Sequence, residues 1–425
     1  MKKSYYNIET IIDNEVLIYN GIAESLVSLN LEEYDLYCKD NLMSSLEEST
    51  IKKMIDCGIL VDSEINELEI IKKDLENAKS SKSSMSVVIA PTLDCNFDCE
   101  YCYEKNAYKK QVFSQESIDS IFRYINYRKN DLASLNLVWT GGEPLLKTDL
   151  IDTITSQIIN QIEGTGIAFT SYIITNGYLL TSETLEMLNR NQIYTLQITL
   201  DGTEDEHNKS RPHVSGRGTF SAILSNIEKN YNLINKLIIR INVDKENDKN
   251  YLELSKIIKK LDHDRKIKIN VSKIEDTNNS YDCKRCYNND EFINFQLNEV
   301  YKIDESLIRD LYPKRRNRYC LADGLYDMVI SPDGLIYKCW ADLGFAENAV
   351  GDINRFISFI DRSTLFDYYD FDPTNDLDCK VCKFLPVCLG GCSKRRIEFG
   401  EKSCLYNDDS FRQIISSYYN DLVHE

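Results

Sequence analysis

The sequence lacks the marks of exported, membrane-spanning and nucleic-acid-binding proteins. Its first ten residues hold two lysines but no apolar stretch of the kind found in secretory signals. No apolar run approaches the length of a membrane span. The formal net charge of −18 at pH 7 argues against broad binding to phosphate backbones. We therefore expect a cytoplasmic protein of 425 residues, with about two or three domains and no nucleic-acid or membrane partner.

Cysteine, by contrast, is abundant, with 14 residues. Because no export signal is visible, we expect reduced thiols or metal ligands rather than disulfides. Cys38 and Cys57 stand alone and are expected to act as small core residues. For the pair Cys283 and Cys286, a redox or ligand role and a solvent-side position are both open. The remaining cysteines form two arrays.

The first array is Cys95, Cys99 and Cys102, spaced Cys-x3-Cys-x2-Cys in a loop after an apolar strand. Three thiolates at this spacing can hold three corners of a [4Fe–4S] cluster, and no fourth cysteine lies nearby to close it. The open iron would then bind a small chelating molecule. A zinc site is the alternative, although zinc prefers four ligands in paired spacings.

This spacing, with the aromatic Tyr101 before the last cysteine, resembles the signature of the radical S-adenosylmethionine (SAM) family. The resemblance implies a [4Fe–4S] cluster on Cys95, Cys99 and Cys102 that binds SAM. In that family the reduced cluster splits SAM, and the resulting 5′-deoxyadenosyl radical takes a hydrogen atom from an unactivated carbon. Such a step needs a dry, closed pocket.

From Val87 onward the sequence repeats strand, loop and helix six times. Ile118, Ile121 and Ile125 follow the helical spacing of an amphipathic helix, and Ser114, Thr181 and Thr219 are plausible helix caps. Alternating units of this kind indicate a parallel sheet with helices outside. Six units are too few for a full eight-stranded barrel, so we predict an α/β fold with a partial (β/α)6 TIM-like barrel. The predicted strands are 87–93, 135–140, 169–175, 195–200, 237–243 and 267–274.

Polar motifs follow the predicted strands, where parallel α/β proteins place their active sites. The second strand is followed by Gly141, Gly142, Glu143 and Pro144, and the resemblance implies that this stretch contacts the methionine amino group of SAM. Glycine allows close approach of a ligand, and a glutamate can receive an ammonium group.

The third and fourth strands end in Asn176-Gly177 and in Thr199-Leu200-Asp201-Gly202, which also suit ordinary turns. The resemblance implies that Thr199 binds the SAM carboxylate or ribose, and we include Asn176 among the SAM contacts. His207 and Arg211 are similar to a His-x3-Arg stretch of peptide and sulfatase maturases. They are either structural or orient Asp201.

The second array has seven cysteines in the carboxyl-terminal quarter of the chain. Their spacing matches the SPASM domain, an auxiliary-cluster module of radical SAM enzymes that modify peptides and proteins; a pair of structural zinc sites is the alternative. The resemblance implies two auxiliary [4Fe–4S] clusters. The first would use Cys320, Cys339 and Cys392, and the second Cys379, Cys382, Cys388 and Cys404.

The first auxiliary set has only three cysteines. Either Cys283 or Cys286 supplies a fourth ligand, or the open iron binds a substrate thiolate. Sulfatase maturases carry an extra cysteine within the stretch that matches Leu321–Lys338, and an Asp where this chain has Trp340. Asp342 is nearby but shifted. These departures weaken a sulfatase-maturase function.

Residues 1–80 are predicted to form a separate domain, with a hairpin turn at Asp13-Asn14 and an acidic helix at about 62–77. The serine-rich stretch Ser80–Ser86 is predicted to be a linker. The pattern is similar to the small winged-helix-like leader-recognition domain of ribosomal peptide maturases, which binds a leader as an added strand. A domain that merely packs on the enzyme is the alternative.

The sequence thus predicts three domains: leader recognition at 1–80, a radical SAM barrel at 81–310 and a loop-rich Fe–S SPASM domain at 311–425. The chain resembles maturases of ribosomally made peptides (RiPPs), such as thioether-forming sactipeptide and ranthipeptide synthases. We expect a precursor peptide as substrate and an electron donor such as flavodoxin or ferredoxin. Protein oxidation of the sulfatase-maturase type, and a non-enzymatic metal-stabilised binding or electron-transfer protein, are the alternatives.

Overall fold

The computed structural model describes residues 1–39, 46–107, 112–278, 281, 284–301, 307–355 and 362–424. By internal contacts the chain divides into two compact units. One unit comprises Met1–Ser80, Asn288–Cys320 and Asp370–Glu425, and the other Ser81–Tyr287 and Leu321–Tyr369. The three domains expected from the sequence stay a prediction, because these units group the carboxyl-terminal segments differently.

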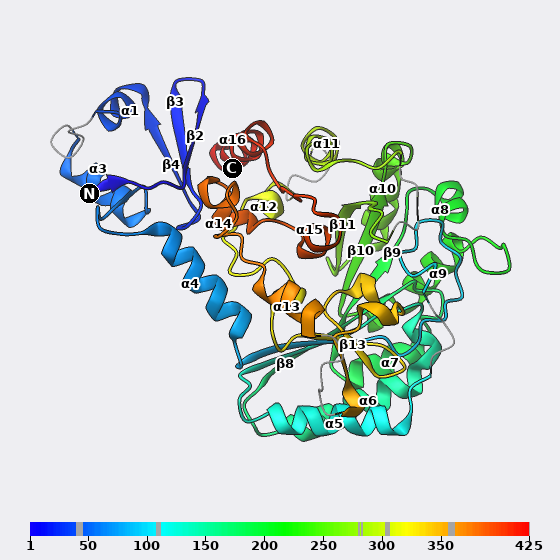
Figure 1. The fold of residues 1–425 in the computed structure, drawn as a ribbon. Coiled ribbons are helices and arrows are strands. Elements are labelled where there is room, and N and C mark those ends of the chain that lie inside the picture. Colours follow the sequence, from blue (N-terminus) through cyan, green and yellow to red (C-terminus); the bar gives the residue numbers. More distant parts are fainter. Residues whose placement is uncertain are drawn as a thin grey trace. The chain divides into compact units, whose positions relative to one another are not determined.

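The second unit is built around a sheet whose strands, among the described residues, run in the order β11-β10-β9-β8-β7-β6-β12-β13-β14 (Figure 1). Each neighbouring pair from β6 to β11 is parallel, which agrees with the mixed α/β, partial-barrel fold expected from the sequence. These strands are β6 (Ser84–Ile89), β7 (Ser134–Trp139), β8 (Ala168–Thr175), β9 (Ile193–Thr199), β10 (Lys236–Val243) and β11 (Ile267–Lys273).

The sequence did not predict that the carboxyl-terminal segment extends this sheet. Strand β12 (Met328–Ile330) pairs parallel to β6, and β13 (Leu335–Tyr337) and β14 (Gly351–Asp352) follow antiparallel. Val88, Val329 and Tyr337 meet in one buried apolar cluster. The segment around Cys339 is therefore fixed to the first strand of the barrel.

Helices cover the outside of the parallel strands, and α5 to α7 contact one another in sequence order (Figure 1). Ser114 and Thr181 cap α5 and α7 as predicted, because their side chains accept hydrogen bonds from the first turns. Thr219 occupies the N-cap position of α9 as predicted, but its side chain makes no capping hydrogen bond, since its hydroxyl instead contacts His207 and Arg211. These helices are α5 (Gln115–Arg128), α6 (Thr148–Ile162), α7 (Ser182–Arg190), α8 (Glu204–Ser210), α9 (Phe220–Asn230) and α10 (Tyr251–Leu261).

The first unit contains a three-stranded antiparallel sheet of β2 (Asn7–Ile12), β3 (Glu15–Asn20) and β4 (Ser25–Asn30). The predicted hairpin turn at Asp13-Asn14 is present, with Asp13 in the left-handed region at φ 49°. Around this sheet lie β1 (Lys2–Lys3), α1 (Leu31–Tyr37), α3 (Glu48–Asp56), β5 (Leu60–Val61) and α4 (Glu67–Ser80). The predicted serine-rich linker is in part wrong, because β6 already begins at Ser84.

The same unit includes the second cysteine array's last five members. Leu17 and Tyr19 of the sheet pack with Val387 and Phe411 in one core cluster, so the amino-terminal sheet and the cysteine-rich segment share a core. The helices of this part are α11 (Asn289–Phe295), α12 (Leu307–Leu311), α14 (Leu385–Cys388), α15 (Ser393–Phe399) and α16 (Asp408–His424), while α13 (Arg362–Asp370) ends at the boundary between the units. No helix in the described ranges has both the length and the apolar character that a bilayer crossing needs.

Candidate active site

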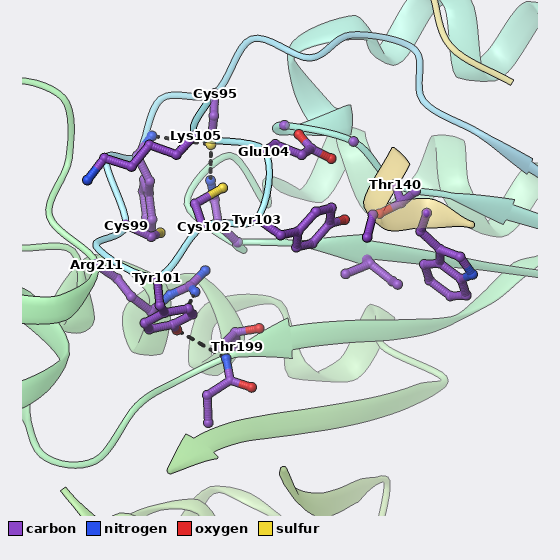
Figure 2. Close-up of a pocket in the computed structure, with 18 of the residues that line it drawn as sticks. Cys95, Cys99, Tyr101, Cys102, Tyr103, Glu104, Lys105, Thr140, Thr199 and Arg211 are labelled. Atoms are coloured by element: carbon purple, nitrogen blue, oxygen red, sulfur yellow. Dashed lines mark hydrogen bonds between the residues drawn. The ribbon is translucent and has the colours of Figure 1, made fainter. Parts of the chain in front are cut away.

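A cavity of about 420 Å³ opens at the carboxyl ends of the parallel strands (Figure 2). The loops after β6 to β9, strands β10 and β11 and the segment after β13 all contribute to its wall. It brings together many of the residues predicted from the sequence. Those that line it are Cys95, Cys99, Cys102, Gly141, Gly142, Asn176, Thr199 and Cys339.

The three cysteines of the first array lie in the loop between β6 and α5 (Figure 2). The amide of Phe97 donates to Sγ of Cys95 across 3.4 Å, and the amide of Cys102 donates to the carbonyl of Cys99 across 3.3 Å. Burial raises the pKa of the Cys95 thiol to about 12, and burial likewise raises the pKa of Cys99. Such thiols become thiolates only where a cation compensates the charge, and thiolates are the ligands of Fe–S clusters. These residues therefore fit a cluster.

In the ranges that the structure describes, no three or more His, Cys, Asp or Glu side chains form a group that could hold a single metal ion.

Two glycines let the loop after β7 approach the cysteine loop. The amide of Gly142 donates to the carbonyl of Thr92 across 3.1 Å, and the amide of Glu143 donates to that of Asp94 across 2.9 Å. A Cβ atom at Gly141, whose φ is 117°, would overlap the carbonyl oxygen of Thr92, and one at Gly142 would overlap that of Asp94. Only glycine therefore allows this pairing of the two loops.

Glu143 and Pro144 are buried but do not line the cavity. The Glu143 carboxylate accepts hydrogen bonds from the hydroxyl of Thr175 at 2.6 Å, from the amide of Asn176 at 2.7 Å and from that of Leu145 at 3.0 Å. Burial raises its pKa, and these hydrogen bonds oppose that shift. In this structure Glu143 thus joins the ends of β7 and β8. Its predicted contact with the SAM amino group stays a prediction.

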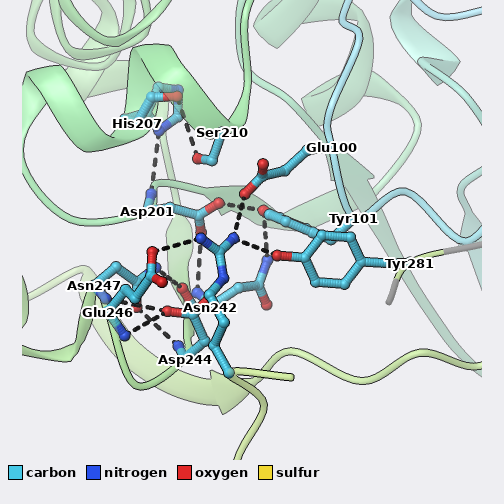
Figure 3. A network of polar contacts seen from close by, with 11 residues as sticks. Glu100, Tyr101, Asp201, His207, Ser210, Asn242, Asp244, Glu246, Asn247 and Tyr281 are labelled. Carbon is cyan, nitrogen blue, oxygen red and sulfur yellow. Dashed lines mark hydrogen bonds and ion pairs between the residues drawn. The ribbon is translucent and has the colours of Figure 1, made fainter. Parts of the chain in front are cut away.

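Tyr101 belongs to a buried polar network, and Figure 3 shows it hydrogen-bonded to Asp201 and Asn242. Its hydroxyl donates to the carboxylate of Asp201, and it accepts from Nη1 of Arg211 at 2.8 Å and from Nδ2 of Asn242 at 3.1 Å. Burial raises the pKa of Asp201, and the charge of the Arg211 guanidinium opposes this shift only in part. The network joins the cysteine loop to the ends of β9 and β10.

His207 supports this network from behind. Its Nδ1 accepts from the amide of Asp201 at 3.1 Å, and its Nε2 lies 3.1 Å from the hydroxyl of Thr219, which donates to the carbonyl of Arg211. Burial lowers the pKa of His207 well below its ordinary value, and Arg211 adds to that shift. His207 is therefore neutral, and it holds Asp201 in place.

Sequence reasoning missed several residues of this site. Arg240 and Asn242 alternate with the buried Ile239 and Ile241 on β10, so the period of two could have placed them on the barrel's inner face. Arg285, in the loop after β11, had no comparable signal. It pairs with Glu100 at 2.9 Å, Asp244 at 3.0 Å and Glu246 at 2.6 Å (Figure 3).

The segment after β13 forms another part of the wall. Cys339, Trp340 and Ala341 line the cavity, and Nδ2 of Asn278 joins the carbonyls of Tyr103 and Ala341 at 2.9 and 2.7 Å. Asp342, by contrast, does not line the cavity and is 1% exposed. Its carboxylate accepts from Asn348 and from Tyr368 instead.

Six cysteines of the second array lie in the first unit, and four of them are the set expected to hold the second auxiliary cluster: Cys379, Cys382, Cys388 and Cys404. The amide of Cys382 donates to the carbonyl of Cys379 across 3.0 Å. Backbone amides of Gly390 and Leu405 hydrogen-bond the thiol of Cys388, which interacts electrostatically with Cys404. Cys382 and Cys388 receive backbone amides and Cys379 receives Arg396, and donors to sulfur of this kind are found at Fe–S cluster ligands.

The expected first auxiliary set stays a prediction. Cys320 and Cys392 belong to the first unit and Cys339 to the second. Of the two candidates for a fourth ligand, Cys286 is disulfide-bonded in this structure, whereas Cys283 lies outside the described residues.

Known proteins resemble this chain in sequence. Residues 89–258 match the model of the radical SAM superfamily. The chain is 22% identical to the cysteine-type anaerobic sulfatase-maturating enzyme of Clostridium novyi (strain NT), over 74% of this chain and 89% of that enzyme. It is 28% identical to the serine-type anaerobic sulfatase-maturating enzyme of Klebsiella aerogenes, over 32% of this chain and 33% of that one.

Two groups of solved structures share the fold. Native anSMEcpe with bound AdoMet aligns with a TM-score of 0.63 at 17% identity, covering 80% of this chain and 98% of that one. Streptococcus suis SuiB bound to precursor peptide SuiA aligns with a TM-score of 0.57 at 17% identity, covering 97% of this chain and 99% of that one. These alignments confirm the α/β partial-barrel fold.

Proposed function

We propose that this protein, whose residues 89–258 match the model of the radical SAM superfamily, is a radical SAM maturase of a ribosomally made precursor peptide. It oxidises one residue of the peptide by two electrons and forms a thioether between a cysteine sulfur and a carbon atom. The carbon loses a hydrogen atom to the radical derived from SAM, the thiol loses its proton to solvent, and the remaining electron would pass to an auxiliary cluster. One observation carries the proposal: Cys339 of the second array lines the same cavity as Cys95, Cys99 and Cys102 of the first. A peptide in this cavity would therefore reach both arrays.

Cys95, Cys99 and Cys102 are the ligands that we assign to a [4Fe–4S] cluster that binds SAM. When bound, the cluster and SAM supply a 5′-deoxyadenosyl radical that removes a hydrogen atom from an unactivated carbon. Gly141, Gly142, Asn176 and Thr199 line the cavity and are the SAM contacts that we propose, with Glu143 and Pro144 fixing the loop that carries the glycines.

The chain itself must keep water from the reacting atoms. Leu93, Phe97, Ile174, Ile274 and Trp340 give the cavity an apolar wall. Asn278, which joins the cysteine loop to the segment after Cys339, holds two sides of that wall together. A dry site protects a radical from stray hydrogen donors.

For the second array we propose two auxiliary [4Fe–4S] clusters. Cys379, Cys382, Cys388 and Cys404 would hold one of them. Cys320, Cys339 and Cys392 would hold the other, with an open iron position for the substrate thiolate. The disulfide at Cys286 supports the open position over a fourth protein ligand from that residue.

The three-stranded sheet is the proposed docking site for the leader of the peptide. Strand β4 lies at one edge of the sheet and, among the described residues, pairs only with β3. An exposed strand edge can take up an extended peptide as a further strand. SuiB, which has a similar fold, was solved bound to its precursor peptide SuiA. We expect a soluble one-electron donor such as flavodoxin or ferredoxin as the second partner, in the cytoplasm.

Protein oxidation of the sulfatase-maturase type is the rival function, and the named relatives favour it. Against it stands Trp340, which replaces the Asp expected directly after Cys339, and the burial of Asp342. Activity on a sulfatase peptide that is lost in Asp342→Asn would favour the rival. The non-enzymatic alternative would be favoured if the reduced protein failed to cleave SAM.

The test is the mass of the short peptide encoded beside this gene after anaerobic incubation with reconstituted protein, SAM and reductant. We expect a loss of two hydrogens, and fragmentation should place the new bond at a cysteine. An unchanged peptide beside cleaved SAM would contradict the proposed substrate. The matched control is Cys99→Ala, which should abolish both reactions.

A further inference from the structure

A buried guanidinium contacts one of the cysteines of the second array. Nη2 of Arg396 lies 3.3 Å from Sγ of Cys379, within hydrogen-bond range for sulfur. The Arg396 side chain is only 11% exposed. Cys379 is itself buried, at 9% exposed. The guanidinium of Arg396 and the sulfur of Cys379 are therefore in contact away from bulk water.

Neighbouring groups hold this guanidinium in one position. Nη1 pairs with the carboxylate of Asp376 at 3.0 Å, and Nη2 also donates to the carbonyl of Gly390 at 3.1 Å. The guanidinium carbon lies 4.9 Å from the ring centre of Phe371. A buried charge needs such partners, because its desolvation is otherwise costly.

Asp376 connects the arginine to the cysteine a second time. Its Oδ1 accepts from the amide of Cys379 at 2.9 Å, while its Oδ2 receives Arg396. The carboxylate thus fixes both the backbone of the cysteine and the donor to its sulfur. Nε of Arg396 is buried and has no partner among the described residues, so the partners of this side chain all lie at its sulfur-facing end.

We propose that Arg396 sets the reduction potential of the cluster held by Cys379, Cys382, Cys388 and Cys404. This inference rests on the auxiliary cluster of the proposed function. Reduction adds one electron and one negative charge to the cluster. A fixed positive charge that donates to a ligand sulfur stabilises that added charge, so it raises the potential. Arg396 is thus a positioning and tuning residue, which touches a ligand and not the substrate.

Arg395 provides a matched control on the same helix. It is adjacent and carries the same charge, but its ion pair is with Glu401 and its side chain is 31% exposed. Comparing Arg396→Gln with Arg395→Gln therefore separates contact with the sulfur from loss of one positive charge. Arg396→Lys keeps the charge but loses the planar guanidinium. Its reduction potential should therefore lie between those of wild type and Arg396→Gln.

The experiment uses the full chain with Cys95, Cys99, Cys102 and Cys339 changed to alanine. Only the four-cysteine site can then hold a cluster. Iron content and the midpoint potential are measured by anaerobic titration with dithionite, followed by electron paramagnetic resonance. We expect unchanged iron in all variants. In Arg396→Gln the ratio of reduced to oxidised cluster at a fixed potential should fall about tenfold, which corresponds to a midpoint potential lower by about 59 mV for one electron. Arg395→Gln should match its parent.

An unshifted potential in Arg396→Gln with full iron content would overturn the tuning role. Equal shifts in Arg396→Gln and Arg395→Gln would do the same, because the effect would then be one of general charge. Loss of iron from Arg396→Gln and Arg396→Lys would assign a purely structural role and also overturn the inference. If the parent itself bound no iron, the auxiliary cluster would be absent, and the fault would lie in the proposed function.

Discussion

Nη1 of Arg211 donates a hydrogen bond to the hydroxyl of Tyr101 across 2.8 Å. Tyr101 directly precedes Cys102, the third cysteine of the first array. The same hydroxyl contacts Asp201 and Asn242, at the ends of β9 and β10. An aromatic residue that the sequence presents as part of a cysteine motif is therefore also the centre of a buried polar network. The position of Cys102 depends on strands more than 90 residues away.

Removing the Tyr101 hydroxyl should destabilise the protein. In Tyr101→Phe the buried groups of Arg211 and Asp201 each lose a partner, which typically costs about 1–3 kcal/mol. The thermal unfolding midpoint should fall by about 2–4 °C for each kcal/mol. Tyr194→Phe, on β9 and 48% exposed, is the control and should unfold like wild type. A midpoint unchanged in Tyr101→Phe would contradict this role.

His207 should make stability sensitive to acid. Burial lowers its pKa in the folded state, so the unfolded chain binds the proton first. The contribution is fully present above the unfolded pKa of about 6.5 and is lost as pH falls toward the folded pKa. Each pH unit in this window removes at most about 1.4 kcal/mol.

Thermal unfolding at pH 7.5 and 5.5 tests this, comparing wild type with His207→Asn. The variant should be less stable at pH 7.5 but should lose less on acidification. His263→Asn, at an exposed site, should show the wild-type dependence. If wild type and His207→Asn lost the same amount of stability between pH 7.5 and 5.5, His207 would not be the source of the pH dependence.

Side chains introduced at Gly141 or Gly142 should disrupt the proposed SAM site without unfolding the protein. Gly142→Ala places a methyl group against the carbonyl of Asp94, so the cysteine loop must move. We expect reduced iron binding after reconstitution and at least about a tenfold loss of SAM cleavage, equivalent to about 1.4 kcal/mol. Gly164→Ala is the control for backbone strain alone: its φ is 72°, which disfavours alanine, but nothing lies within 4 Å of the added atom, so iron content and SAM cleavage should be unchanged. Full iron content and full cleavage in Gly142→Ala would be incompatible with the close approach.

Proline substitutions in β4 test leader docking. Along an antiparallel strand, adjacent residues direct their N–H groups to opposite sides. One of the two variants Val27→Pro and Ser28→Pro therefore removes a backbone hydrogen bond to β3 and lowers the thermal unfolding midpoint. The other removes a backbone N–H donor at the outer edge of β4. The second variant should keep its midpoint but weaken binding of a fluorescent precursor peptide to the full chain. Unchanged affinity in this thermally intact variant would rule out docking at β4.

The sequence predicted the repeating part of the fold, and it predicted that the three cysteines of the first array and Gly141 and Gly142 lie at the same ends of the strands. Periodicity located the six parallel strands, because each apolar run is short and bounded by a polar motif. The cysteines and glycines gather in one cavity because parallel strands bring their carboxyl ends to one edge. Local spacing was enough for both inferences.

Long-range pairing was beyond the sequence pattern. Strand β12 has three residues and joins β6 across more than 230 positions, and no local period reveals such a partner. Thr219 looked like a helix cap because its residue type suits that role, but the neighbouring His207 takes its hydroxyl. Glu143, whose contact with SAM stays a prediction, also accepts hydrogen bonds from three donors of the fold that no local pattern reveals. These contacts depend on the tertiary structure and not on the residue type alone.

The central claim is that radical chemistry on a peptide takes place in the cavity lined by Cys95, Cys99, Cys102 and Cys339. The most direct measurement is the isotope content of the 5′-deoxyadenosine formed when the reconstituted protein is incubated anaerobically with SAM and a deuterated precursor peptide. The account predicts transfer of deuterium from the peptide into 5′-deoxyadenosine, together with loss of two hydrogen isotopes from the peptide. 5′-Deoxyadenosine that carries no deuterium, formed at the same rate with and without the peptide, would contradict it.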